Sequence, residues 1–91
     1  MTRFTPAPDV RFASTEDGAM LLNLATGRFF GLNPTAAAIW RQIADGTPPE
    51  DIAVALAVGL AVPEKRLLSD VHALMTVLRR HELLVGKEPL E

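Results

Sequence analysis

The chain has 91 residues, 48% of them hydrophobic and 22% charged, which is typical of one small globular domain rather than a disordered segment. A formal net charge of -2 argues against a domain that binds nucleic acid through phosphate contacts. The lack of cysteine excludes disulfides, thiol catalysis and cysteine-ligated metals. No apolar run approaches the roughly 18 residues of a membrane span, and no signal-peptide segment precedes the domain, so we expect a cytoplasmic protein without membrane contact.

The first part of the chain predicts an antiparallel meander of three short strands. We expect residues 1–9 to form a flexible arm, because they contain two prolines and little periodicity. Strands are expected at Val10–Ser14, Ala19–Leu24 and Arg28–Leu32, since short extended patterns are separated there by two glycine-containing turns. In this meander the third strand lies at an edge of the sheet.

The next part predicts two helices. The first begins at Asn33-Pro34, because Asn caps free backbone N–H groups and Pro suits the first helical position. Trp40 lies on the apolar face of this helix, so we expect it to be a core residue. The second helix is expected over 47–58, where Thr47 and Glu50 have the spacing of a capping box.

The third helix is the longest, covering roughly Glu64–His81 after a proline. A short closing segment follows at Glu82–Val85, and residues 86–91 are expected to fray. The order of elements predicts one α+β domain over residues 10–85, with the helices covering one face of the sheet.

The chain lacks the clustered polar residues that catalysis needs. His72 and His81 lie nine residues apart on one helix, about two and a half turns, so they point in different directions. Neither Ser14 nor Ser69 lies in a Gly-x-Ser-x-Gly elbow, and Gly27–Gly31 lacks the lysine of a phosphate loop. We therefore predict a protein that is not an enzyme and needs no metal or cofactor.

The third helix has an unusually broad apolar surface, covering roughly half of its circumference. Either a small domain wraps its core around this stripe, or one margin stays open as a groove for an apolar ligand side chain. For a groove we favour the margin of Leu68 and Met75, with Val71 nearer the centre, over the opposite margin at Val77. Met is pliable and suits a surface that receives another chain.

The third strand, Arg28–Leu32, carries two adjacent phenylalanines that point to opposite faces of the sheet. Its free edge is either covered by the N-terminal arm or the closing segment, or used by an extended peptide that adds itself as a further strand. The candidate peptide-binding residues are Arg28, Phe29, Phe30, Gly31, Leu32, Leu68, Val71 and Met75.

The stretch Leu21–Trp40 resembles the signature region of PqqD-like proteins. The resemblance extends to Asp45-Gly46, Asp70-Val71 and Leu83-Leu84, and covers about residues 10–85. Within this family the chain is most similar to the stand-alone leader-binding proteins of lasso-peptide pathways, which are RiPP recognition elements.

The resemblance implies a winged-helix-like domain that binds the leader of a ribosomally made precursor peptide. The leader is expected to pair with Arg28–Leu32 and to lie against the third helix. The implied partners are a leader peptidase and an ATP-dependent cyclase, or, in a PqqD-type alternative, a radical enzyme of cofactor biosynthesis. Two positions depart from the family pattern: Asn23 stands where an acidic residue is common, and Ala36 where Gly is common.

A winged-helix nucleic-acid-binding regulator is the alternative from another class of protein. Its recognition helix needs exposed basic or amide side chains that enter a groove of the duplex. Here the long helix is apolar over half of its circumference and the net charge is negative, so we do not expect a nucleic-acid partner.

Overall fold

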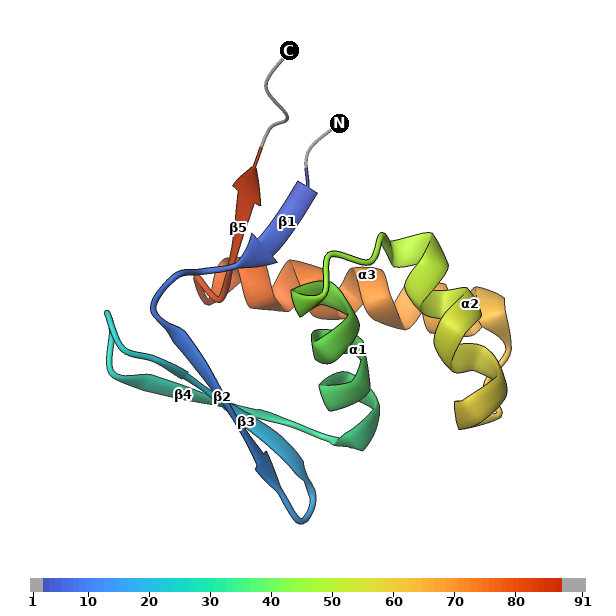
Figure 1. The fold of residues 1–91 in the computed structure, drawn as a ribbon, viewed down its shortest axis with the longest axis horizontal. Helices are drawn as coiled ribbons and strands as arrows, with labels where there is room; N and C mark the ends of the chain where they lie inside the picture. The colour runs from blue at the N-terminus through green and yellow to red at the C-terminus, as the bar shows by residue number, and fades with distance from the viewer. Residues whose placement is uncertain (1–2, 88–91) are drawn as a thin grey trace.

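A computed structural model describes residues 3–87 of the chain. Its elements are β1 (Arg3–Pro6), β2 (Val10–Thr15), β3 (Gly18–Asn23), β4 (Arg28–Leu32), α1 (Pro34–Ala44), α2 (Pro49–Leu60), α3 (Glu64–Arg80) and β5 (Leu84–Lys87). The predicted α+β class is confirmed, since a three-stranded antiparallel sheet is followed by three helices (Figure 1). Among the described residues, no helix has the length and apolar character required to cross a membrane.

The three-stranded sheet has the order β2-β3-β4, which confirms the meander and places β4 at an edge. Leu21 in the central strand pairs with Phe12 on one side and Phe30 on the other, and Met20 pairs with Gly31. Directly paired residues point to the same face of a sheet. Leu21 is 0% exposed whereas Met20 is 40% exposed, so the Leu21 face is the inner face against the helices.

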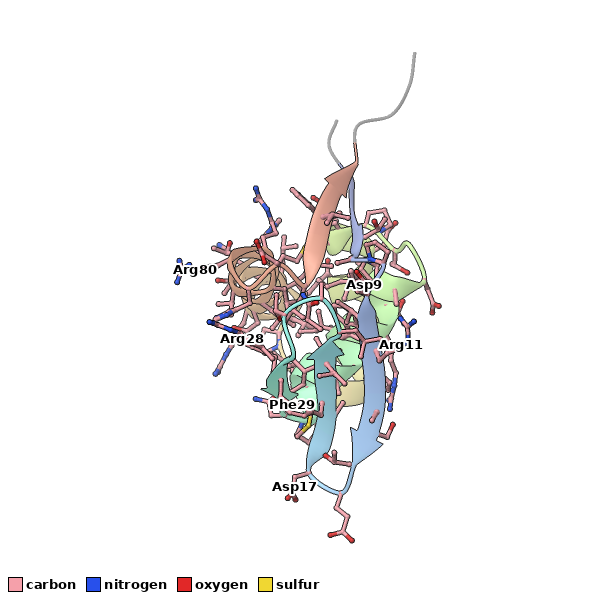
Figure 2. The ribbon with its side chains drawn as sticks, turned by 90° about the vertical axis from the view of Figure 1, so that its left-hand side faces the viewer. Asp9, Arg11, Asp17, Arg28, Phe29 and Arg80 are labelled. Carbon is pink, nitrogen blue, oxygen red and sulfur yellow. The ribbon has the colours of Figure 1, made fainter. Side chains whose placement is uncertain are left out.

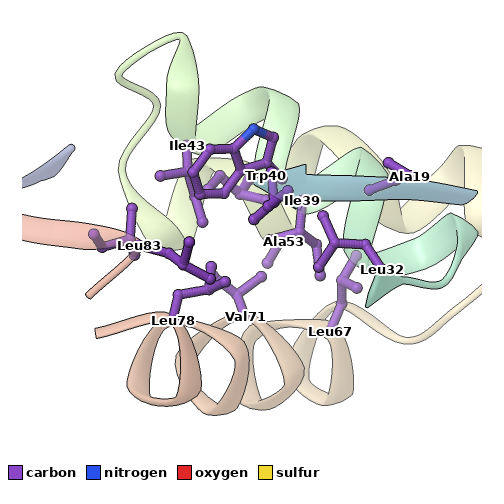
Figure 3. Close-up of a cluster of buried hydrophobic side chains, with 14 residues drawn as sticks. Ala19, Leu32, Ile39, Trp40, Ile43, Ala53, Leu67, Val71, Leu78 and Leu83 are labelled. Atoms are coloured by element: carbon purple, nitrogen blue, oxygen red, sulfur yellow. The ribbon is translucent and has the colours of Figure 1, made fainter. Parts of the chain in front are cut away.

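Helix α1 starts as its sequence predicts. The Asn33 side-chain oxygen accepts a hydrogen bond from the Ala36 backbone N–H at 2.8 Å, and Pro34 occupies the first helical position. Trp40 is buried at 4% exposure, which confirms that it is a core residue. Figure 3 shows it in one cluster with side chains of α3 and the sheet.

Helix α2 differs from its prediction at both ends. It begins after Pro48 without a side-chain cap, and the Thr47 hydroxyl hydrogen-bonds to the Gln42 side-chain oxygen at 3.0 Å. The expected capping box between Thr47 and Glu50 is therefore wrong, because the helix starts too late for Thr47 to be its cap. The helix also continues past Val58 and closes with a left-handed residue, Ala61.

The first and last described strands form a second ribbon, in which β1 and β5 pair antiparallel. The predictions of a loose arm and of fraying from residue 86 are wrong for residues 3–6, 86 and 87, whereas 1–2 and 88–91 lie outside the described residues. Contacts with residues distant in sequence explain why these segments form strands. Phe4 packs against the core, and the Arg79 guanidinium lies 4.3 Å from the centre of its ring.

Candidate functional site

Strand β4 has one free edge. It pairs with β3 on one side, and no strand within residues 3–87 pairs with its other side. The two segments that the sequence offers as covers, the N-terminal arm and the closing segment, pair with each other as β1 and β5 instead. The Arg28 backbone N–H donates to the Thr26 hydroxyl at 3.3 Å. The edge of β4 beyond Arg28 has no strand partner, which is the geometry that an added strand requires.

A hollow of about 370 Å³ lies beside β4, where the strand meets the end of α3. The Phe30 ring of β4 contacts the His81 imidazole, with the ring centres 5.3 Å apart and the planes tilted by 49°. The hollow is lined by Asn23, Gly27, Arg28, Phe29, Phe30, His81 and Leu83. The lining residues include two basic side chains, Arg28 and His81, and no carboxylate. Figure 2 shows Arg28 and Phe29 on the same flank of the molecule as Arg80.

Asn23 fixes the geometry of this hollow by joining two connections distant in sequence. Its side chain is 4% exposed. Its oxygen accepts hydrogen bonds from the Ala25 and Thr26 backbone N–H groups at 2.9 and 3.3 Å, which shapes the β3–β4 turn. Its amide donates to the Glu82 carbonyl at 3.2 Å, which ties that turn to the α3–β5 connection. An Asp here retains the two accepted bonds and loses the donated one.

In the sequence analysis, Asn23 is singled out only because an acidic residue is common at its position in PqqD-like proteins. Its position just before a glycine-containing turn was the available signal, because Asn side chains commonly accept from backbone N–H groups two residues on. The bond to Glu82 spans 59 positions and left no local signal. His81 was missed for the same reason, since its role depends on contact with Phe30 in another element.

The contact between Phe30 and His81, the residue directly after α3, offers a reference direction around the helix axis. At 100° per residue, Asp70, Leu74 and Val77 lie within about 40° of His81 around the helix axis. Leu74 and Val77 are half-buried, so they carry apolar surface that is still partly accessible. We propose that this margin, to which the sequence analysis gave second preference, lies beside β4.

The comparison with family models completes the assignment. The model for coenzyme PQQ synthesis protein D (PqqD) matches residues 18–84. This chain belongs to the PqqD family. The match runs from the start of β3 to the start of β5, and therefore includes β4, Asn23 and all of α3.

Two solved structures resemble this PqqD-family chain closely. One is described as a lasso peptide synthetase B1 complexed with the leader peptide. It is 31% identical, with 91% of this chain and 98% of that chain covered and a TM-score of 0.83. The other is described as TbiB1 in complex with the TbiA(beta) leader peptide. It is 29% identical, with 93% and 99% covered and a TM-score of 0.83. No curated protein matches the chain.

The predicted site residues on β4 come together in the structure of this PqqD-family domain. Arg28, Phe29 and Phe30 all line the hollow. Gly31 is exposed on the same strand. Leu32 contributes its backbone to β4, but its side chain is 5% exposed and belongs to the core.

The predicted residues on α3 do not join them. Val71 is 0% exposed and packs in the core, and it does not line the hollow. Leu68 and Met75 lie about 140° and 120° around the helix from His81. Met75 instead lines a separate cavity of about 430 Å³ together with Phe4 of β1.

Proposed function

We propose that this PqqD-family chain is a non-catalytic recognition module for the leader of a ribosomally synthesised precursor peptide. The leader adds to β4 as a further strand, and the domain presents it to a leader peptidase and a cyclase of the lasso-peptide type. The observation that carries this proposal is the free edge of β4 beside the hollow where Phe30 meets His81. The two similar B1 structures support it, because both are complexes with leader peptides.

Affinity for the leader and selectivity among leaders come from different parts of the site. Backbone hydrogen bonds along β4 hold any extended segment, and the side-chain surroundings decide which segment fits. Side chains of the added strand alternate between the two faces of the sheet. Those that point inward meet Phe30, His81 and Leu83 of the hollow, so the inward positions of the leader are expected to be apolar.

Catalysis is assigned to partners because the hollow lacks the groups for it. Among the residues that line it, His81 is the single common general base, and no Ser, Thr, Asp or Glu accompanies it. The modification itself therefore belongs to the enzymes that receive the leader. Since precursor peptides are made on ribosomes, the proposal also places this step in the cytoplasm.

A titration tests leader binding directly. The probe is a fluorescently labelled synthetic leader of roughly 10 to 20 residues. It is taken from the precursor encoded beside this gene, with the TbiA(beta) leader as a second probe. We expect saturable one-to-one binding by fluorescence anisotropy. Absence of saturable binding to either probe contradicts the proposal.

A second experiment separates the lasso-type partners from a radical enzyme. The domain with bound leader is passed over a size-exclusion column together with a leader peptidase, a cyclase or a radical enzyme, whichever of them is encoded near its gene. Comigration with the peptidase or cyclase supports the lasso assignment. Comigration with a radical enzyme alone supports the PqqD-type alternative instead.

A further inference from the structure

The outer face of the three-stranded sheet carries apolar side chains that no helix of residues 3–87 covers (Figures 1 and 2). Phe29 is 67% exposed and Met20 is 40% exposed, and Leu22, which pairs with Phe29, lies between them half-buried. Phe29 points to this face because it alternates with Phe30, whose partner Leu21 lies on the inner face. Phe29, Met20 and Leu22 therefore form an apolar patch with a largely exposed aromatic ring beside a free strand edge, which is a feature of interaction sites.

Gly31 stands in the same edge strand, and the fold does not require a glycine there. A Cβ built at Gly31 meets no atom within 4 Å, and its φ lies outside the left-handed range. Gly18 is the contrast: its φ is +140°, and a Cβ there collides with the Leu32 carbonyl oxygen. A glycine within a strand often marks a bulge, a tight bend or the close approach of another chain. Gly31 pairs in regular register with Met20, so close approach is the reason that fits here.

The strand register determines which side chain of an added strand lies next to Gly31. Gly31 pairs with Met20, so the bare backbone of Gly31 lies on the outer face beside Met20 and two residues from Phe29. A strand that adds to β4, in either direction, sends every second side chain to this same face. The side chain next to Gly31 then lies over the glycine, between Phe29 and Met20.

We infer, resting on the proposed function, that the leader is recognised on both faces of the sheet. Its residue opposite Gly31 carries a large apolar side chain, which covers the glycine and packs against Phe29 and Met20. The inner hollow and this outer site select alternating positions of one leader. Phe29 and Gly31 are therefore specificity-determining residues; Phe29 also borders the hollow, whereas Gly31 does not line it.

Three variants test the outer site with the labelled leader as the probe. Phe29→Thr removes the aromatic contact and keeps a residue suited to an exposed strand. Gly31→Val fills the space over the glycine. Ala13→Val is the matched control, because Ala13 is exposed and pairs with Met20 from the opposite side, on β2. We expect the first two to weaken binding at least about tenfold, or about 1.4 kcal/mol, and the control to stay within about twofold.

The leader itself supplies the second half of the test. Serine is placed at each leader position in turn, and each peptide is titrated against the wild type and Phe29→Thr. We expect coupling to Phe29 only at positions of the outward-facing set, strongest at the residue opposite Gly31, whose serine variant loses affinity for the wild type and little more for Phe29→Thr. Coupling at these positions, with normal folding by circular dichroism, supports the inference.

Two results overturn it. If the wild type binds the leader and Phe29→Thr and Gly31→Val bind it equally well, the outer face does not contact the leader, although the proposed function stands. If sedimentation shows that the unliganded wild type is a dimer and Phe29→Thr a monomer, the patch serves a second copy of the chain. A wild type that binds no leader contradicts the proposed function itself.

Discussion

Asn23 is the residue whose side chain joins the β3–β4 turn to the connection after α3. Asn23→Leu removes all three of its hydrogen bonds and leaves the Glu82 carbonyl without this donor. We expect the free energy of unfolding to fall by about 1–3 kcal/mol, the usual cost of an unmade buried hydrogen bond. Urea denaturation measures this. An unchanged denaturation midpoint contradicts the role assigned to Asn23.

Val77 and Met75 provide a matched pair on opposite margins of α3, because both are half-buried apolar residues of one helix. Val77→Glu places a carboxylate on the margin that we propose lies beside β4, and we expect leader affinity to fall at least about tenfold, since burying an unpaired charge is costly. Met75→Glu alters the separate cavity near Phe4 and should leave affinity within about threefold. Anisotropy titrations of variants that remain folded decide between the margins. The reverse order of effects contradicts the placement of the groove.

At the scale of elements, the free edge of β4 makes a prediction about the leader backbone. In an added strand only alternate N–H groups point toward β4. Methylation of single leader nitrogens should therefore abolish binding at every second position across the paired segment and be tolerated between them. Titration of a set of singly N-methylated leaders measures the pattern. Equal sensitivity at consecutive positions contradicts strand addition.

The elements also show what the sequence can and cannot predict. The start of α1 at Asn33 and the extent of β4 follow from local chemistry, so both were predictable. The margin of α3 that a leader would contact does not follow from the sequence, because apolar residues occupy both margins. The rotation of the helix is set by the burial of Leu67, Val71 and Leu78 against other elements, which no periodicity within α3 reveals.

At the scale of the whole molecule, the ribbon of β1 and β5 brings the two ends of the chain together. Local patterns do not carry this pairing, which is why residues 3–6 were expected to be loose. Phe4 packs against the core beneath the Arg79 guanidinium. We expect Phe4→Ala to lower the free energy of unfolding by about 1–3 kcal/mol, measured by urea denaturation. A variant as stable as the wild type contradicts a structural role for this ribbon.

Hydrogen–deuterium exchange with and without the leader tests the central claim most directly, because the sheet has two edges and strand addition selects one of them. β2 lies at the other edge and serves as the internal control. With the leader at saturation, we predict that exchange slows at least about tenfold for the β4 amides that point away from β3. Exchange of the amides at the free edge of β2 is expected to stay unchanged. Unchanged exchange along β4, or protection of β2 in its place, contradicts leader binding by strand addition to β4.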